Sequence, residues 1–83
     1  MHLVVLTPEK ELFNGEIKLV RLPGSNGSFE ILNNHAPIIS SLEEGEVKII
    51  PESGNEIHYK ISGGVVECKQ NNVILLIEKL LAE

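Results

Sequence analysis

Two short segments of this sequence carry residue types that could do chemistry. The first is Gly24–Ser28, which has the glycines and hydroxyls of a loop that cradles a phosphate. A phosphate-binding loop of the Gly-x-x-x-x-Gly-Lys-Ser/Thr type also needs a lysine and a following helix, so that backbone amides and an ammonium group meet the phosphate. No lysine follows Gly27, and the residues after it alternate as in a strand. The segment is therefore predicted to be a tight turn, in which Pro23 sets φ and Gly24 can take a positive φ.

The second segment places His35 directly before Ala36-Pro37, with Ser40 and Ser41 a few residues further on. A histidine with a serine and a glutamate could form a hydrolytic triad, but no Gly-x-Ser-x-Gly sequence is present to raise a serine nucleophile above a sheet. The three histidines lack the spacing of metal ligands, and a single cysteine cannot supply a cysteine cluster. No residues supply a general acid, a base and an oxyanion hole together. The sequence therefore predicts no catalytic residues, no metal and no cofactor.

The composition of the 83 residues excludes several classes of partner. Seven Lys and Arg stand against twelve Glu, and a net charge of −5 is the opposite of what a nucleic acid or an anionic lipid surface attracts. The only cysteine, Cys68, is predicted to be a small buried hydrophobe, and a free thiol fits a reducing, intracellular compartment. No signal peptide is recognisable, and the longest apolar run, Val73–Ile77, is far shorter than a membrane span of about 20 residues. Any membrane association is expected to go through a partner protein, without direct insertion.

The segments that would position these residues are short strands. Turn signals recur from Thr7-Pro8 to Asn71-Asn72, and between them apolar and polar residues alternate, as in the segment 45–50. Short alternating strands with frequent turns are typical of an all-β sandwich or barrel, here as a single domain over residues 1–83. After Ile77 too few residues remain for an independent helix. Strands are expected near residues 2–7, 11–14, 16–22, 28–32, 37–41, 45–50, 56–62, 64–69 and 72–78.

The segment His35–Ser41 has the features of a docking surface. Pro37 cannot donate a backbone hydrogen bond, which indicates that the strand it opens lies at the edge of a sheet. The small side chains of Ala36, Ser40 and Ser41 would let the backbone of a partner come close. The residues alone therefore favour an interaction surface over an active site.

The order and spacing of four motifs resemble one protein family over nearly the whole chain. The motifs are Pro23-Gly24 with Gly27 and Phe29, then His35-Ala36-Pro37, then Leu42, Gly45, Val47 and Ile49, and finally Ser62-Gly63-Gly64. In this order they resemble the N-terminal domain of the epsilon subunit of F-type ATP synthases. The resemblance implies a flattened β-sandwich of about ten short strands. It also implies a non-catalytic rotor subunit that links the gamma subunit to the membrane-embedded c-ring and takes no small-molecule substrate.

The same resemblance implies which residues meet each partner. The gamma subunit would lie against His35, Ala36, Pro37, Ile38, Ile39, Ser40 and Ser41. The c-ring would meet Thr7, Gly24, Ser25, Asn26, Gly27, Ser28 and Glu30. The complex would sit on the cytoplasmic face of the bacterial inner membrane, with this chain as a peripheral part. An isolated copy is expected to be a monomer with an exposed apolar patch that gamma normally covers.

Two positions depart from the pattern of the family. Glu30 stands where a glycine is usual, so its contact is expected to differ, or its carboxylate to pair with a basic partner residue. Asn33-Asn34 stands where Pro-Gly is common before the histidine, which keeps the turn possible but makes it less rigid. Full-length members continue into a pair of C-terminal helices, which can inhibit hydrolysis and in some members bind ATP, whereas this sequence stops after the sandwich.

Two other functions stay open at this point. A stand-alone β-sandwich could bind an anion or another ligand through the loop Gly24–Ser28. A small hydrolase could use His35 with Ser40 or Ser41. Saturable amide shifts in the glycine loop on adding nucleotide would indicate the first function, and loss of a measured activity in His35→Ala would indicate the second.

Overall fold

The computed structural model describes all residues from 1 to 83 and contains nine β-strands and no helix. The predicted all-β class is therefore confirmed. The structure contains no helix with the length and apolarity that a membrane crossing requires. The strands are β1 (His2–Leu6), β2 (Glu11–Gly24), β3 (Gly27–Leu32), β4 (Ile38–Leu42), β5 (Gly45–Pro51), β6 (Ile57–Ile61), β7 (Gly64–Lys69), β8 (Asn72–Ile77) and β9 (Leu80–Ala82).

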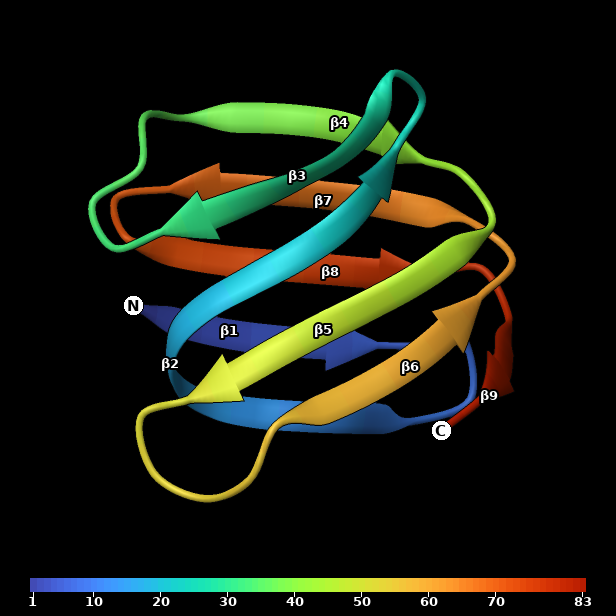
Figure 1. Cartoon of the computed structure of the whole chain (residues 1–83), viewed down its shortest axis with the longest axis horizontal. Coiled ribbons are helices and arrows are strands. Elements are labelled where there is room, and N and C mark those ends of the chain that lie inside the picture. The colour runs from blue at the N-terminus through green and yellow to red at the C-terminus, as the bar shows by residue number, and fades with distance from the viewer.

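The strands form two layers because the long strand β2 takes part in both. One layer, which we call sheet I, has the strand order β4-β7-β8-β1 and ends with the first half of β2, which pairs with β1. The second half of β2 pairs with β3 on one edge and β5 on the other, and β6 and β9 complete sheet II. In Figure 1 the second half of β2, with β5 and β6, crosses over β1, β7 and β8. The chain is thus a β-sandwich in which β2 passes from one layer to the other.

The continuity of β2 differs from the prediction. The sequence predicts a turn at Asn14-Gly15 that divides this segment into two strands, whereas the structure has one strand of 14 residues. Both residues stay extended because they pair with Val4 and Leu3 of β1. The irregularities lie on either side of this position, where the register with β1 shifts between Val5 and Leu6 and where the register with β5 shifts between Ile17 and Leu19. The merger is one reason why the structure has nine strands and not about ten.

The C-terminal residues form a strand that the sequence does not predict. Leu80–Ala82 make up β9, which pairs with Lys60 and Ile61 of β6. The partner edge lies about twenty residues earlier in the chain, and the pairing has no local turn signal of a hairpin. The end of the chain is therefore extended and not helical.

The core between the layers is built almost entirely from Ile, Leu and Val, as the composition predicts. Burial along β8 has a period of two although every residue from Val73 to Ile77 is apolar. Cys68 is 1% exposed and burial raises the pKa of its thiol, so the prediction of a small buried hydrophobe is confirmed. The core consists of Met1, Leu3, Val5, Ile17, Val20, Leu22, Ile31, Leu42, Val47, Ile49, Tyr59, Ile61, Val66, Cys68, Val73, Leu75 and Ile77.

Strand β4 lies at an open edge of sheet I, as Pro37 predicts. It pairs with β7 from Ile38 to Leu42, but on its other side it meets β2 only at Gly24. The strand begins directly after the proline. The backbone of Ile38–Ser41 therefore has no strand partner on the outer edge.

Candidate functional site

The outer side of sheet I carries a continuous set of apolar side chains. Ile39 of β4 is 73% exposed, and the three members on β7 and β8 are between 40% and 48% exposed. Two half-buried residues of β1 extend the set. This set, which we call the apolar face, consists of Ile39, Val65, Ile74, Leu76, Val4 and Leu6.

The register of sheet I explains why these residues lie together. Val65 of β7 lies opposite Leu76 of β8, and Leu76 lies opposite Leu6 of β1. Ile74 in turn lies opposite Val4. Directly opposite side chains on one face of a sheet have Cβ atoms about 5 Å apart and contact each other. Strand β8 thus packs one side into the core and presents an equally apolar side outward.

The outer side of sheet II is charged instead. Arg21 donates to Glu30 from two nitrogens, at 3.1 and 2.8 Å, across the β2–β3 pair. Lys48 lies 3.8 Å from one carboxylate oxygen of Glu56, and His58 donates to the other oxygen at 3.0 Å. These charges are paired within the chain, whereas nothing in the chain covers the apolar face. An exposed apolar patch on one side only marks an interaction surface, as the sequence predicts.

The predicted gamma contacts on β4 point to both sides of the sheet. Ile39 and Ser41 are exposed on the outer side, whereas Ile38 and Ser40 point to the inner side and are half-buried. Ser40 lies opposite the buried Val66, and its hydroxyl donates to the backbone oxygen of Ser41 at 3.1 Å. Of the two serines, only Ser41 offers its side chain to a partner on the apolar face.

The three residues before β4 form a loop that borders the apolar face. Ala36 and Pro37 are exposed, and His35 is half-buried. The His35 amide donates to the Leu32 oxygen at 3.1 Å, and its ring nitrogen Nδ1 donates to the Ala36 oxygen at 2.7 Å. Neither bond reaches a serine, so the contact between histidine and serine that a hydrolase requires is not formed.

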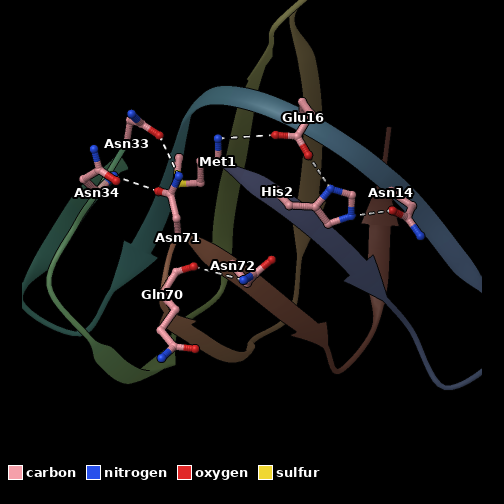
Figure 2. A network of polar contacts seen from close by, with 9 residues as sticks. All are labelled: Met1, His2, Asn14, Glu16, Asn33, Asn34, Gln70, Asn71 and Asn72. Carbon is pink, nitrogen blue, oxygen red and sulfur yellow. Dashed lines mark hydrogen bonds and ion pairs between the residues drawn. The ribbon is translucent and has the colours of Figure 1, made fainter.

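Asparagine side chains join this loop to the hairpin between β7 and β8 (Figure 2). The Asn71 amide nitrogen donates to the Asn33 side-chain oxygen at 2.9 Å, and the Asn71 side-chain oxygen accepts from the Asn34 backbone amide at 2.8 Å. Asn34 and Asn71 have φ angles of 62° and 63°, a left-handed conformation that asparagine tolerates better than most residues. The less rigid turn expected at Asn33-Asn34 is therefore held by a side chain 37 residues away from Asn34.

We expect Asn71→Ala to release this loop. The substitution removes both side-chain bonds at a position of positive φ, so the free energy of unfolding should fall by about 1–3 kcal/mol. The Asn34 amide should also exchange faster with solvent in a hydrogen-exchange experiment. Asn72→Ala is the matched control, because the Asn72 side chain on the same hairpin bonds only to the Gln70 backbone oxygen. Unchanged exchange at Asn34 in the Asn71 variant would contradict this account.

His2 joins β1 to β2 through both ring nitrogens (Figure 2). Nδ1 lies 2.6 Å from a Glu16 carboxylate oxygen, and Nε2 lies 2.7 Å from the Asn14 side-chain oxygen. The Asn14 amide nitrogen donates to Glu11 at 3.3 Å, which leaves its oxygen to face the histidine. Only the doubly protonated imidazolium has two N–H groups to donate. These bonds, above all the one to Glu16, raise the pKa of His2, and the same bond lowers the pKa of Glu16.

This pairing predicts how stability depends on pH. A histidine with a raised folded pKa contributes stability that is fully present below its unfolded value of about 6.5 and is lost as pH rises through the folded pKa. Glu16 behaves oppositely, because its folded pKa is lowered, and its contribution is lost as pH falls through that pKa. We expect NMR titration to give His2 a pKa above 6.5, and Glu16→Gln to bring it closer to that value. His58, whose pKa is raised by Glu56 and Glu46, should not change in that variant, and an unaltered His2 would contradict the pairing.

The residues predicted to meet the c-ring fall into two separate turns. Thr7 stands before the start of β2 and Gly24–Ser28 form the hairpin at its end, so the two turns lie at opposite ends of this strand (Figure 1). The Thr7 hydroxyl accepts from the backbone amides of Glu9 and Lys10 at 3.2 and 3.1 Å, which fixes the first turn. Because β2 bends back as it passes from one layer to the other, both turns lie toward the same side of the sandwich in Figure 1, and their common contact with the c-ring stays a prediction.

The glycine loop is a hairpin turn that needs no ligand to explain its glycines. Gly24 pairs with Gly27 across the hairpin, and Gly27 has a φ of 113°. A Cβ atom on Gly24 would lie 2.9 Å from the Gly27 oxygen and from the Phe29 ring. Strand β3 follows the turn, without a helix N-terminus whose amides could hold a phosphate. A tight turn is therefore present as predicted, but the positive φ falls on Gly27, whereas Gly24 is the last residue of β2. The geometry does not favour an anion site.

Glu30, which departs from the family pattern, has its basic partner within the chain. It lies opposite Arg21 in the register of β2 and β3 and forms the ion pair described above. Both side chains are more than a third exposed, so the pair contributes little to stability. Glu30 nevertheless presents a fixed carboxylate near the hairpin.

The chain is similar to members of one known family. The family described as the β-sandwich domain of the ATP synthase delta/epsilon chain matches residues 1–83. The ATP synthase epsilon chain of Chlorobaculum tepidum is 40% identical over 76 residues, which cover 92% of this chain and 86% of that relative. The ATP synthase epsilon chain of Caulobacter vibrioides is 35% identical over 78 residues, which cover 94% of this chain and 90% of that relative.

A solved structure has the same fold. It is described as the central stalk and c-ring of the mitochondrial ATP synthase of Tetrahymena thermophila. One of its chains superimposes with a TM-score of 0.83 at 22% identity, covering 98% of this chain and 65% of that one. The predicted β-sandwich is therefore confirmed by the strands, the family and this likeness.

Proposed function

Because this chain belongs to the family of ATP synthase delta and epsilon β-sandwich domains, we propose that it is a subunit of the central stalk, or rotor, of a proton-translocating F-type ATP synthase. It performs no chemistry of its own. It binds the gamma subunit and the c-ring, so that rotation of the ring driven by protons reaches the catalytic head as torque. It is a peripheral part of a membrane-associated complex, on the cytoplasmic face of the inner membrane in a bacterium.

The apolar face is the observation that supports gamma binding most directly. Four of its six side chains are exposed and two are half-buried in the isolated chain. Covering apolar surface yields about 25 cal/mol per Å². Ile39 and Ser41 lie on the outer side of β4 in this region, and the loop His35–Pro37 borders it. The close-packed core behind sheet I resists deformation, which suits a surface that transmits torque.

The two turns at the ends of β2 are proposed to meet the c-ring. They contribute Thr7, the hairpin Gly24–Ser28 and, on β3, Glu30. Ser25–Ser28 and Glu30 are exposed and are not part of the apolar face. One copy can therefore hold gamma on sheet I while other residues contact the ring.

Capture of the detergent-solubilised synthase through its gamma subunit tests this function. We expect the chain to be recovered in the same molar amount as gamma. A complex that retains gamma and the c-ring but lacks this chain would contradict the proposal. Adding nucleotide while following amide shifts at Gly24, Gly27 and Ser28 is the second measurement, because saturable shifts there would favour a ligand-binding module instead.

A further inference from the structure

Glu67 is a charged side chain in the middle of the apolar face. It lies on β7, opposite Ile39 on β4 and opposite Ile74 on β8. Its side chain is exposed, and none of the six ion pairs of the chain includes it. On sheet II, Glu30 and Glu56 form ion pairs with basic residues of the chain. Glu67 differs from them because apolar residues surround it and no cation of the chain pairs with it.

A hollow of about 350 Å³ lies beside Glu67 at the open edge of β4. Pro37, Ile38 and Ile39 supply its apolar wall, and Glu67 and Lys69 supply its charged groups. An apolar wall next to a carboxylate matches the two parts of a lysine or arginine side chain. The alkyl stem packs on apolar groups, and the cationic head reaches an anion.

Docking of a partner over the apolar face would remove water from around Glu67. Burying a carboxylate without a compensating cation is strongly unfavourable, so a purely apolar partner would bind this face poorly. Lys69 lines the same hollow but forms no ion pair with Glu67. A cation of the partner would supply the compensating charge.

We propose that the hollow beside Glu67 receives a lysine or arginine side chain of the gamma subunit, with Glu67 as its counter-ion. This inference rests on the proposed function and adds to it the charge that gamma presents. Glu67 then sets specificity, because it disfavours any surface that covers it without supplying a cation.

The charges around the rest of the face agree with a basic partner surface. A second hollow, of about 540 Å³, lies at the other end of β7 beside Val65 and Leu76 of the apolar face. Three glutamates line it, Glu43, Glu44 and Glu78. Complementary charge across an interface speeds encounter and suppresses wrong partners, so this negative end favours approach of a positive surface.

Charge variants of Glu67 test the proposal, because the direction in which they change the affinity for gamma depends on whether a cation faces Glu67. We expect Glu67→Gln to weaken binding to the gamma-containing head of the synthase by about 30-fold, and Glu67→Lys to weaken it further. If no cation faced Glu67, the neutral variant would lose the cost of burying a charge and would bind more tightly. Tighter or unchanged binding of Glu67→Gln would therefore overturn the inference.

Lys69→Met is the matched control for a cation supplied by the chain itself. We expect unchanged affinity in this variant, and a loss as large as that of Glu67→Gln would overturn the inference. The partner residue is found by changing the lysines and arginines of gamma to glutamate one at a time. One such change should restore binding of Glu67→Lys, and the absence of any rescue would count against a direct ion pair.

A neutral change at Ile39 separates failure of this inference from failure of the proposed docking face. Ile39→Asn should weaken gamma binding whatever charge lies opposite Glu67. If Ile39→Asn binds normally, the apolar face is not the gamma site. The proposed docking face and the proposed role of Glu67 are then both wrong. If Ile39→Asn binds weakly while Glu67→Gln binds tightly, only the role of Glu67 is wrong.

Discussion

Ile39→Asn is expected to weaken binding to gamma by about 30-fold, or about 2 kcal/mol, while the isolated chain stays folded. Ile39 is 73% exposed, more than any other large apolar residue that the chain exposes. In a covered interface the substitution would lose apolar burial and leave an amide without hydrogen-bond partners. In the free chain the same amide is in water, so the free energy of unfolding should change little.

Leu32→Asn is the matched control for this prediction. Leu32 is 51% exposed, but it lies on β3, on the outer side of sheet II. Titration of the gamma-containing head with each variant gives the affinities, and thermal unfolding gives the stabilities. An equal loss of affinity in both variants would show that the effect is not specific to the apolar face, and no loss in Ile39→Asn would place gamma elsewhere.

Alternation along the sequence predicts most of the strands, because the contrast between apolar and polar neighbours is a local property. It fails at β2, since Asn14-Gly15 is a turn signal in isolation and stays extended only because β1 pairs with it. It fails at β9 for the same reason, because Leu80–Ala82 are extended by their pairing with β6. Both errors arise where a partner that is distant in the sequence overrides a local preference.

The site is predictable in part. Pro37 and the small residues around it indicate a docking segment at a sheet edge, and β4 has that position. The sequence does not predict which side of sheet I binds a partner. The segment Val73–Ile77 is apolar throughout, so no alternation distinguishes its buried side from its exposed side. Only the register with β7 and β1 shows that Ile74 and Leu76 face outward. The apolar run does indicate that β8 needs cover on both faces of its sheet, but it does not say which face a partner covers.

The hydrogen bonds that hold the β3–β4 loop cannot be predicted from the neighbouring sequence either. Asn33-Asn34 alone indicates a flexible turn, and nothing nearby in the sequence points to Asn71. The bonds exist because β4 and β8 both pair with β7, so the β3–β4 loop and the β7–β8 hairpin meet at one end of sheet I. A departure from the family pattern at one loop is thus accommodated by a side chain on another.

Gly64→Ala is expected to lower the free energy of unfolding by about 4 kcal/mol or more, a large part of the 5–15 kcal/mol that is typical of a small domain. A Cβ atom at this position would lie 2.2 Å from the Leu76 backbone oxygen and 3.3 Å from the Ile77 Cα atom. These are backbone atoms of β8, which pairs with β7 on one side and β1 on the other. They cannot move away without breaking ladder hydrogen bonds, so the methyl group forces the strands apart.

Gly15→Ala is the matched control, and together the two variants test more than stability. A Cβ atom at Gly15 would lie 3.4 Å from the Phe13 ring, an ordinary contact, so urea unfolding should show no loss or a gain of up to about 1 kcal/mol. If Gly64→Ala were equally mild, β7 and β8 could not approach each other as the structure has them. The pairing of Gly64 with Ile77 also sets Val65 opposite Leu76 and Glu67 opposite Ile74. A mild result would therefore remove the register that builds the apolar face and places Glu67 within it.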